Sequence, residues 1–192
     1  LPHIPTSTAR PATVTLESGF AVASAQAARW DADAALAAVT AYIYWPTSPV
    51  ASTATAVPGD GWMVYVFAAG RRALSIYVNR NTGNVVTQSV AVWQEGLARR
   101  VDLAAYAVGS DIAVQIAEIV MGNAYRAGCP THRYLTQVTA SLGTTGDGAP
   151  GAQWVVTYAD LRTLDRTDLL LRVDAVRGSV VASDDGSGPC AP

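Results

Sequence analysis

The sequence predicts an α+β fold made of two tandem repeats, each a helix packed on an antiparallel β-meander. The main observation is a stretch of alternating apolar residues that occurs twice, from Trp62 to Val86 and from Trp154 to Val181. Alternation with a period of two is typical of β-strands, and a glycine in each copy marks a hairpin turn. Half of the residues are apolar and only 15% are charged, which is typical of a globular chain.

The 192 residues are enough for one large or two small domains. The first 13 residues are rich in Pro and Thr, which indicates an extended tether. The last residues contain Gly and Pro without an apolar pattern, which indicates a loose tail. We therefore predict a tether at 1–13, a first unit at 14–97, a second unit at 98–185 and a tail at 186–192.

In the first unit, we expect a short strand at 12–17 and a helix within 24–44. Residues 24–44 are rich in alanine, which has the highest helix propensity, and prolines follow them. The strand that begins at Trp62 is apolar on both faces. We therefore expect a helix to cover one face of the sheet and another part of the chain, such as the other repeat, to cover the opposite face. The alternating segments predict strands at 50–57, 62–67, 73–79 and 85–93.

In the second unit, Ser110 is a candidate N-cap, and Asp111 suits the positive end of a helix dipole. Helical periodicity continues to Arg126 and is carried by the following residues: Ile112, Ile116, Ile119, Val120 and Tyr125. Four further segments complete the unit as strands at 134–142, 154–158, 169–174 and 179–183.

The glycine turns resemble a known family. The segments Val173–Val181 (Val-Asp-Ala-Val-Arg-Gly-Ser-Val-Val) and Val78–Val86 (Val-Asn-Arg-Asn-Thr-Gly-Asn-Val-Val) are similar to the V-D-A-x-T-G-x-V hairpin of PepSY and PepSY-like domains. The first copy keeps Thr-Gly but has Asn79 in place of Asp, whereas the second keeps Asp174 but has Arg177 in place of Thr. In both, glycine supplies the left-handed turn residue.

This resemblance covers most of residues 24–185 as two copies. It implies a helix on an antiparallel sheet, an extracytoplasmic location and a non-catalytic role, such as the inhibition or regulation of peptidases. The family has no catalytic residues to carry over, and a fold alone does not define a function.

Composition narrows the possible functions. The net charge is −2, which gives no electrostatic footprint for nucleic acid. No apolar run approaches the roughly 18 residues that span a bilayer. The chain begins at Leu1 rather than Met, so we expect an upstream signal peptide or membrane anchor. All 13 basic residues are arginine, which excludes lysine chemistry and is typical of a GC-rich bacterial genome.

Few residues suggest reactive chemistry. Cys129 and Cys190 lack CxxC spacing, so we expect a disulfide rather than a zinc site. His132 lies three residues after Cys129, and an exposed histidine is a simpler interpretation than a nucleophile pair. The loop from Asp160 to Asp168 mixes aspartates with arginines and lacks a calcium-loop register, so we expect solvated ion pairs. We predict no metal and no cofactor.

Aromatic residues around the first helix and at the end of the first sheet form a candidate ligand or partner surface, because exposed tryptophans are enriched in binding hot spots. The alternative for these residues is packing in the core. The set comprises Trp30, Tyr42, Tyr44, Trp45 and Trp93.

The sequence thus favours a secreted or surface-anchored bacterial protein that binds an envelope or secreted partner, such as a peptidase, without catalysis. One alternative is a small-ligand site lined by Trp62, Tyr65, Trp154 or Tyr158, between helix and sheet or between the repeats. The other is a hydrolase that uses aspartates of the 160–168 loop.

Overall fold

The computed structural model describes residues 14–44, 62–80, 82–90, 101–128, 136–143, 153–160 and 169–185. The predicted tether at 1–13, the predicted strand at 50–57 and the predicted tail at 186–192 lie outside these ranges. The elements are α1 (Leu16–Trp30), β1 (Ala35–Tyr44), β2 (Trp62–Ala69), β3 (Arg72–Asn79), β4 (Val85–Val90), the 3-10 turn η1 (Leu103–Ala105), α2 (Ser110–Ala117), the π-helix η2 (Glu118–Gly122), α3 (Asn123–Gly128), β5 (Thr136–Gly143), β6 (Gln153–Asp160), β7 (Leu169–Asp174) and β8 (Val180–Asp185).

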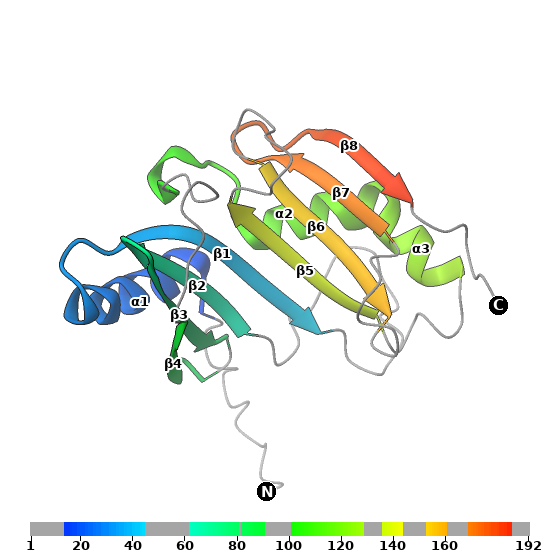
Figure 1. The fold of residues 1–192 in the computed structure, drawn as a ribbon. Helices are drawn as coiled ribbons and strands as arrows, with labels where there is room; N and C mark the ends of the chain where they lie inside the picture. Colours follow the sequence, from blue (N-terminus) through cyan, green and yellow to red (C-terminus); the bar gives the residue numbers. More distant parts are fainter. Residues whose placement is uncertain are drawn as a thin grey trace, which may run out of the picture.

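All eight strands belong to one antiparallel sheet with the order β4-β3-β2-β1-β5-β6-β7-β8 (Figure 1). The α+β class is therefore confirmed. A helix followed by four strands occurs in each half of the chain, and the two first strands, β1 and β5, pair at the centre of the sheet. The predicted strands at 62–67, 73–79 and 169–174 are confirmed as β2, β3 and β7.

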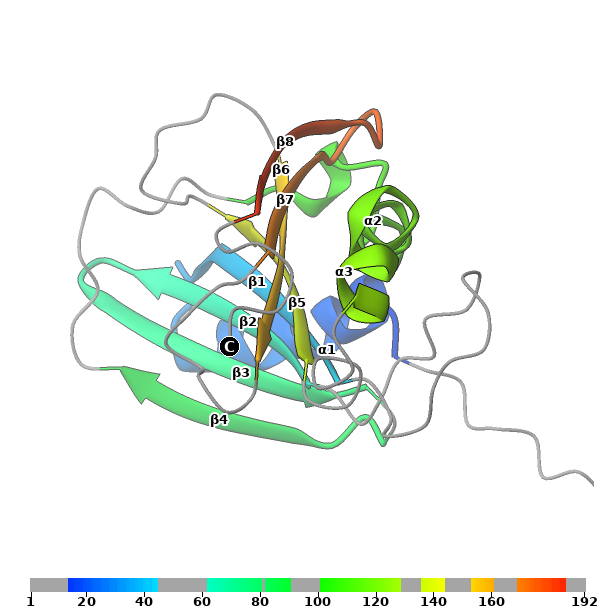
Figure 2. The ribbon, with the colours of Figure 1, turned by 90° about the vertical axis from the view of Figure 1, so that its right-hand side faces the viewer.

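The helices lie on one face of the sheet (Figure 2). The register shows this directly, because Tyr65 pairs with Val39, Val39 with Leu142, and Leu142 with Trp154. Cross-strand partners point to the same face, so Tyr65 and Trp154 share one. Each of these two side chains is fully buried and reaches the helical layer of its own half.

Hydrogen bonds join the sheet to that layer. The Tyr65 hydroxyl donates to the carbonyl of Leu16 in α1 at 2.8 Å. The Trp154 indole Nε1 donates to the carbonyl of Val108, just before α2, at 2.6 Å. A buried hydroxyl or indole N–H is costly without a partner, so these two bonds fix where each helix begins above the sheet.

The first helix lies earlier than the sequence predicts. The predictions of a strand at 12–17 and a helix within 24–44 are wrong, because α1 starts at Leu16 and residues 35–44 form β1. A capping box starts α1: the Ser18 N–H donates to Thr15 Oγ1, and the Thr15 N–H donates to Ser18 Oγ. β1 pairs on both edges, and this backbone ladder outweighs the helix propensity of its alanines.

The two tryptophans that mark the copies in the sequence are not equivalent in the sheet. Trp62 pairs with Asn79 at the end of β3, whereas the residue that pairs with Asp174 at the end of β7 is Gln153. Trp154 is thus displaced by one position, which places it on the opposite face. It is fully buried beneath the helices, but Trp62 is only half-buried on the helix-free face, so the two tryptophans do not share one core.

The hairpin turns follow the sequence prediction. Gly83 and Gly178 both have φ of +72°, in the left-handed region that glycine adopts without strain. The backbone N–H of Asn79 donates to Asn84 in the first turn, and that of Asp174 donates to Ser179 in the second. The two turns therefore have the same backbone geometry.

The residue that opens each turn accepts hydrogen bonds with its side chain. Asn79 Oδ1 accepts from the Thr82 N–H at 2.9 Å. Asp174 Oδ1 accepts from the N–H groups of Val176 at 2.8 Å and Arg177 at 2.7 Å. Asn and Asp both make such turns, which explains why the two copies differ at this position. The bonds from Arg177 and Val176 lower the pKa of Asp174 from its ordinary value of 3.8.

Glycines in the helices make room for sheet tyrosines. A β-carbon on Gly19 of α1 would lie 2.4 Å from the Tyr65 hydroxyl oxygen. A β-carbon on Gly122 would lie 2.0 Å from the hydroxyl oxygen of Tyr158. Both distances are far inside van der Waals contact, so each glycine permits a tyrosine hydroxyl to reach the helix above it.

We predict that Gly19→Ala lowers the free energy of unfolding by about 2 kcal/mol, the usual cost of overpacking a core. The cost should be smaller in a Tyr65→Phe background, because the nearest clashing atom is then gone. Chemical denaturation of the four proteins of this double-mutant cycle measures the coupling. An equal cost of Gly19→Ala in both backgrounds contradicts the proposed contact.

We also predict a pH-dependent contribution of Asp174. Because its pKa is lowered in the folded state, the charged carboxylate stabilises the fold above the unfolded-state pKa of about 4, and this contribution is lost as pH falls through the folded value. The difference in melting temperature between the wild type and Asp174→Asn should therefore be largest near neutral pH and shrink below about pH 4. A difference that stays constant from pH 7 to pH 2 contradicts this assignment.

Candidate functional site

The outer face of the helical segment 110–128 exposes large aliphatic side chains. Ile119 is 77% exposed, Val120 is 51% exposed and Ile112 is 47% exposed. Ile116 lies on the same side, because residues three or four positions apart share one side of a helix. It is half-buried. This side points away from the sheet.

The turn between β7 and β8 exposes a further aliphatic side chain. Val176 in that turn is 54% exposed. The turn also lies against the helix, because a β-carbon on Gly178 would be 3.3 Å from Ile116 Cδ1. Apolar surfaces of roughly a few hundred Å² on a monomer often mark interaction sites. We define the α2 patch as the four exposed residues Ile112, Ile119, Val120 and Val176.

The sequence signals this helix correctly but not its orientation. α2 begins at Ser110, and its N-cap is Gly109, so the prediction of Ser110 as the N-cap is wrong by one residue. The residues that carry the helical periodicity are largely exposed, whereas Ala113, Val114 and Ala117 are buried. Small side chains let a helix approach the sheet closely. The run of small residues on one side is the signal that could have revealed the outward direction of the isoleucines.

The other helix of the layer lacks such a surface. In α1 the buried face is also made of small residues, including Gly19, Ala23 and Ala27. Its outward positions are occupied by short or polar residues, such as Ser18 and Arg29. Among the described residues of α1, Val22 is the one large aliphatic side chain that is strongly exposed, at 43%. The α2 patch is thus particular to the second half of the chain.

A π-helix lies in the middle of the α2 patch. At η2 the wider turn places Glu118 inward, where it is buried, and leaves Ile119 and Val120 outward. Glu118 Oε1 accepts a hydrogen bond of 2.6 Å from the Tyr158 hydroxyl. The ring of Tyr125 packs edge-on against Tyr158, with 5.9 Å between ring centroids. π-Helical turns recur at functional sites, and here the turn anchors the exposed residues to the sheet beneath.

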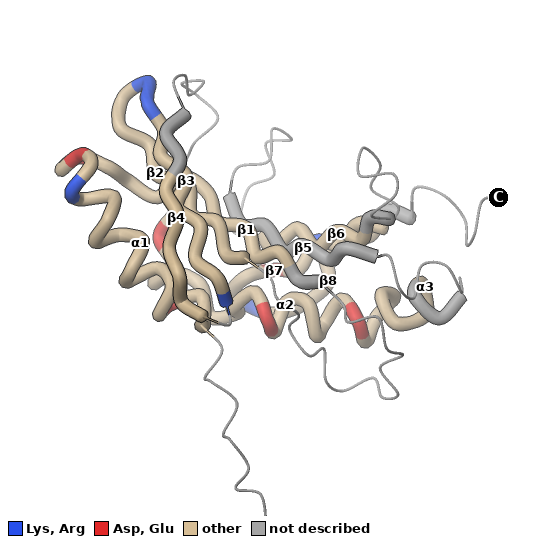
Figure 3. The backbone as a smooth tube through the Cα atoms, turned by 90° about the horizontal axis from the view of Figure 1, so that it is seen from below, with Lys and Arg blue, Asp and Glu red and all other residues tan. Residues whose placement is uncertain are grey.

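A buried arginine connects the first half of the chain to α2. Arg80, in the turn after β3, is 1% exposed, and its Nη2 donates to Oδ1 of Asp111 at 2.5 Å. Asp111 lies in the first turn of α2, one of the two acidic positions of the 110–122 segment that Figure 3 shows in red. Among the described residues, Arg80 Nε and Nη1 are buried without a hydrogen-bond partner. Within this part of the chain, the ion pair with Asp111 therefore compensates the buried charge.

The charges at the start of the two helices influence one another. Burial raises the pKa of Tyr65, the nearby Glu17 carboxylate raises it further, and Arg80 opposes these effects. The Glu17 carboxylate also lies near Gly109, since a β-carbon there would be 3.9 Å from Glu17 Oε1. Charged groups from both helix starts thus lie close to one another, and burial is the main cause that favours the protonated Tyr65 hydroxyl.

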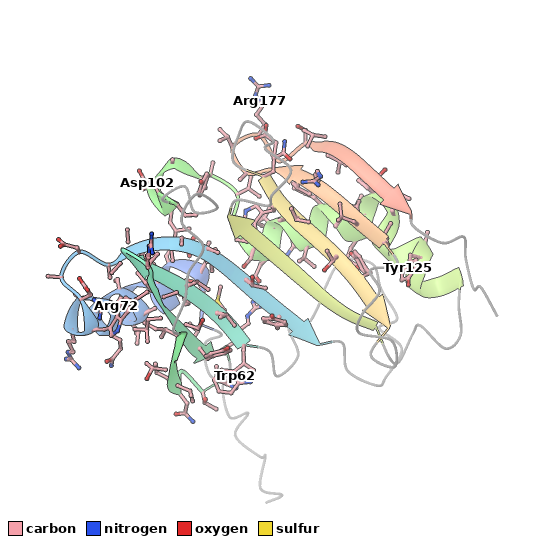
Figure 4. The ribbon with its side chains drawn as sticks, in the orientation of Figure 1. Trp62, Arg72, Asp102, Tyr125 and Arg177 are labelled. Carbon is pink, nitrogen blue, oxygen red and sulfur yellow. The ribbon has the colours of Figure 1, made fainter. Side chains whose placement is uncertain are left out.

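The aromatic residues predicted as a binding surface do not gather in one place. Trp30, at the end of α1, lies under the Arg72 guanidinium, which is 5.2 Å from the ring centroid and pairs with Asp31. Tyr42 lies near the other end of β1, some seven residues or about 23 Å along the strand from Ala35. In Figure 4, Arg72, which contacts Trp30, and Trp62, which lies near the Tyr42 end of β1, are at opposite ends of the β2–β3 hairpin.

Several predicted residues cannot be placed in the site. Tyr44 is the last residue of β1, and nothing further is described for its side chain. Trp45 and Trp93 lie outside the described residues, as do Cys129 and Cys190 of the predicted disulfide. The same holds for His132 and for the loop 161–168 that suggested a hydrolase.

The four residues predicted to line a small-ligand pocket do not face one space. Tyr65, Trp154 and Tyr158 are fully buried on the helix side, and each donates a hydrogen bond to a helix or to the segment before it. Trp62 lies on the other face. These residues serve the core, so the pocket hypothesis has no geometric support from them.

Among the residues that the structure describes, no group of three or more His, Cys, Asp or Glu side chains is placed to hold a metal ion. No helix among the same residues is long and apolar enough to cross a membrane.

Comparison with known proteins gives a relationship at the level of the fold. No protein-family model matches the chain, and no curated protein matches its sequence. Among solved structures, the chain is similar to a putative lipoprotein from Clostridium difficile 630, with a TM-score of 0.55 and 11% sequence identity. The match covers 90% of this chain and 93% of the clostridial protein. The likeness therefore extends over both halves of the sheet and concerns the fold alone.

We predict that Asp111→Ala destabilises the protein by about 2–3 kcal/mol, because it leaves the buried Arg80 charge without compensation. Replacement of both partners, as Arg80→Met with Asp111→Ala, should restore most of this loss, since the buried charge is then removed. Asp33→Ala, at an exposed aspartate after α1, is the matched control and should change stability by less than about 0.5 kcal/mol. Thermal or urea unfolding measures all three. A double variant as unstable as Asp111→Ala alone would refute the role of the ion pair.

Proposed function

We propose that this chain is a non-catalytic, extracytoplasmic bacterial protein that binds an envelope or secreted protein through the α2 patch. The observation that carries the proposal is the exposure of Ile112, Ile119 and Val120 on a helix whose inner face is packed with alanine and valine. Such side chains gain little from water and much from burial against a partner.

We further propose that the protein consists of two tandem PepSY-like units. In support, the chain order of a helix and four strands occurs twice, and the two turns share their backbone bonds. The segment before each helix makes a matching contact: the Val14 N–H donates to Arg80 O, and the Val108 N–H donates to Ala175 O. Arg80 and Ala175 have the same position in their turns, and each accepts a hydrogen bond from the residue two positions before its helix. The resemblance of both turns to the PepSY hairpin agrees with this arrangement.

The extracytoplasmic location is supported by two observations. The PepSY resemblance implies it, and the clostridial protein with the same fold is described as a lipoprotein, a class anchored at the cell envelope. A partner of the α2 patch would then be another envelope or secreted protein, and a peptidase is one class that fits the PepSY resemblance.

The two helices provide an internal comparison for this function. Both use small residues to pack on the sheet, so the outward residues of either helix are free to vary without cost to the core. Three large aliphatic side chains are strongly exposed on the α2–η2 segment, whereas Val22 is the one on α1. This difference supports a binding role for the second unit and a supporting role for the first.

We predict that Ile119→Asp weakens partner binding by at least about tenfold, the effect of losing a central apolar contact in an interface. Val22→Asp, at the corresponding exposed aliphatic residue of α1, is the control and should leave binding unchanged. The immobilised chain and both variants are exposed to an envelope fraction, and the affinity of the captured protein is then measured after purification.

Both variants should keep the wild-type melting temperature, because each position is exposed. Equal binding by the wild type and Ile119→Asp argues against the α2 patch. A turnover activity that persists through purification to homogeneity argues against the non-catalytic assignment.

A further inference from the structure

The sheet ends in two outer strands with different chemistry. β4 (Val85–Val90) closes one side of the sheet and β8 (Val180–Asp185) closes the other. Among the described strands, each is paired on one side only. An outer strand offers a row of backbone donors and acceptors to any further strand, and proteins usually blunt it with charges, prolines or bulges.

β8 carries such protection. It ends in Asp184 and Asp185, and its pairing with β7 shifts register between Arg172 and Val173. β4 has the sequence Val-Val-Thr-Gln-Ser-Val, with neither charge nor proline, and it pairs with β3 in regular register over its whole length. β-Branched residues favour a strand, so β4 is the edge prepared for further pairing.

The register identifies the backbone groups that β4 offers. The Asn79 N–H donates to Asn84 O at 2.9 Å and the Asn79 C=O accepts from the Gly83 N–H at 2.8 Å, so Asn79 directs both of its backbone groups toward the β4 side. Hydrogen-bonded and non-bonded pairs alternate in an antiparallel ladder. The next residue, Val85, therefore directs its N–H and C=O away from β3, and so do Thr87 and Ser89.

We propose that β4 pairs antiparallel with β4 of a second copy of this chain, which extends the eight-stranded sheet across a two-fold axis. The outward groups are satisfied when Thr87 of one copy lies opposite Thr87 of the other. Val85 then lies opposite Ser89, and Val86 opposite Gln88. No charge meets a like charge in this register, and a central Thr–Thr pair is favourable on a sheet.

The side chains at this edge agree with a second copy as the occupant. Val86 is 54% exposed on the helix-free face, and Thr87 is exposed on the face that carries the helices. Because the contact is a single six-residue strand from each copy, we expect it to bury less than the roughly 800 Å² per partner of a standard interface and to dimerise in the micromolar range rather than below it.

Analytical ultracentrifugation of the full chain between about 1 µM and 1 mM tests the proposal, because a weak dimer must show mass that rises with concentration. Thr87→Lys should weaken the dimer at least tenfold, since it places two positive charges opposite each other. Ser183→Lys, an exposed position on β8, is the matched control and should leave the dimer unchanged.

A charge-swap experiment separates the proposal from misfolding. Thr87→Glu alone should also be monomeric, whereas an equal mixture of Thr87→Lys and Thr87→Glu should recover a dimer, because the two charges then attract. Circular dichroism confirms that each variant is folded. A wild type that remains monomeric at 1 mM, or a mixture that does not dimerise, overturns the proposal. Ile119→Asp should dimerise like the wild type, so this result is independent of the α2 patch.

Discussion

The pairing of β1 with β5 is the interaction on which the rest of the structure depends. It joins two four-stranded halves into one sheet and aligns their helix-bearing faces. Because the register is continuous from Tyr65 through Val39 and Leu142 to Trp154, both helical layers fall on one side. That common side brings the turn after β3 near the start of α2, and Arg80 can then reach Asp111.

Much of the fold follows from local sequence signals. Alternating residues placed β2, β3 and β7, and the left-handed conformations of Gly83 and Gly178 follow from the turn pattern. The first helix does not follow, because 35–44 has a helical composition but gains backbone pairs on both edges. Such pairing depends on β5, about a hundred residues away, and no local pattern contains it. The sequence also does not reveal which face of the sheet Trp62 occupies, because a register shift of one residue moves a side chain to the opposite face.

The residues of the proposed surface on α2 were visible in the sequence under a different interpretation. Ile112, Ile119 and Val120 produce a clear helical period, and a period alone gives no direction. The direction is decided by Ala113 and Ala117, which pack where larger residues would hold the helix away from the sheet. The aromatic residues are the more conspicuous candidates for a binding surface in the sequence, but Trp30 lies just before the start of β1 and Tyr42 lies near its end. The packing role of small residues therefore carries more information about this site than the count of large ones.

The central position of β1 also has an evolutionary consequence. Under the proposal of two tandem units, an ancestral protein with one helix and four strands would have had β1 as an open edge, flanked by water on the side now occupied by β5. Two such chains could have closed that edge against each other in the antiparallel arrangement that β1 and β5 adopt today. Joining them in one polypeptide would have turned an association between molecules into a contact within one, and freed the second helix to diverge.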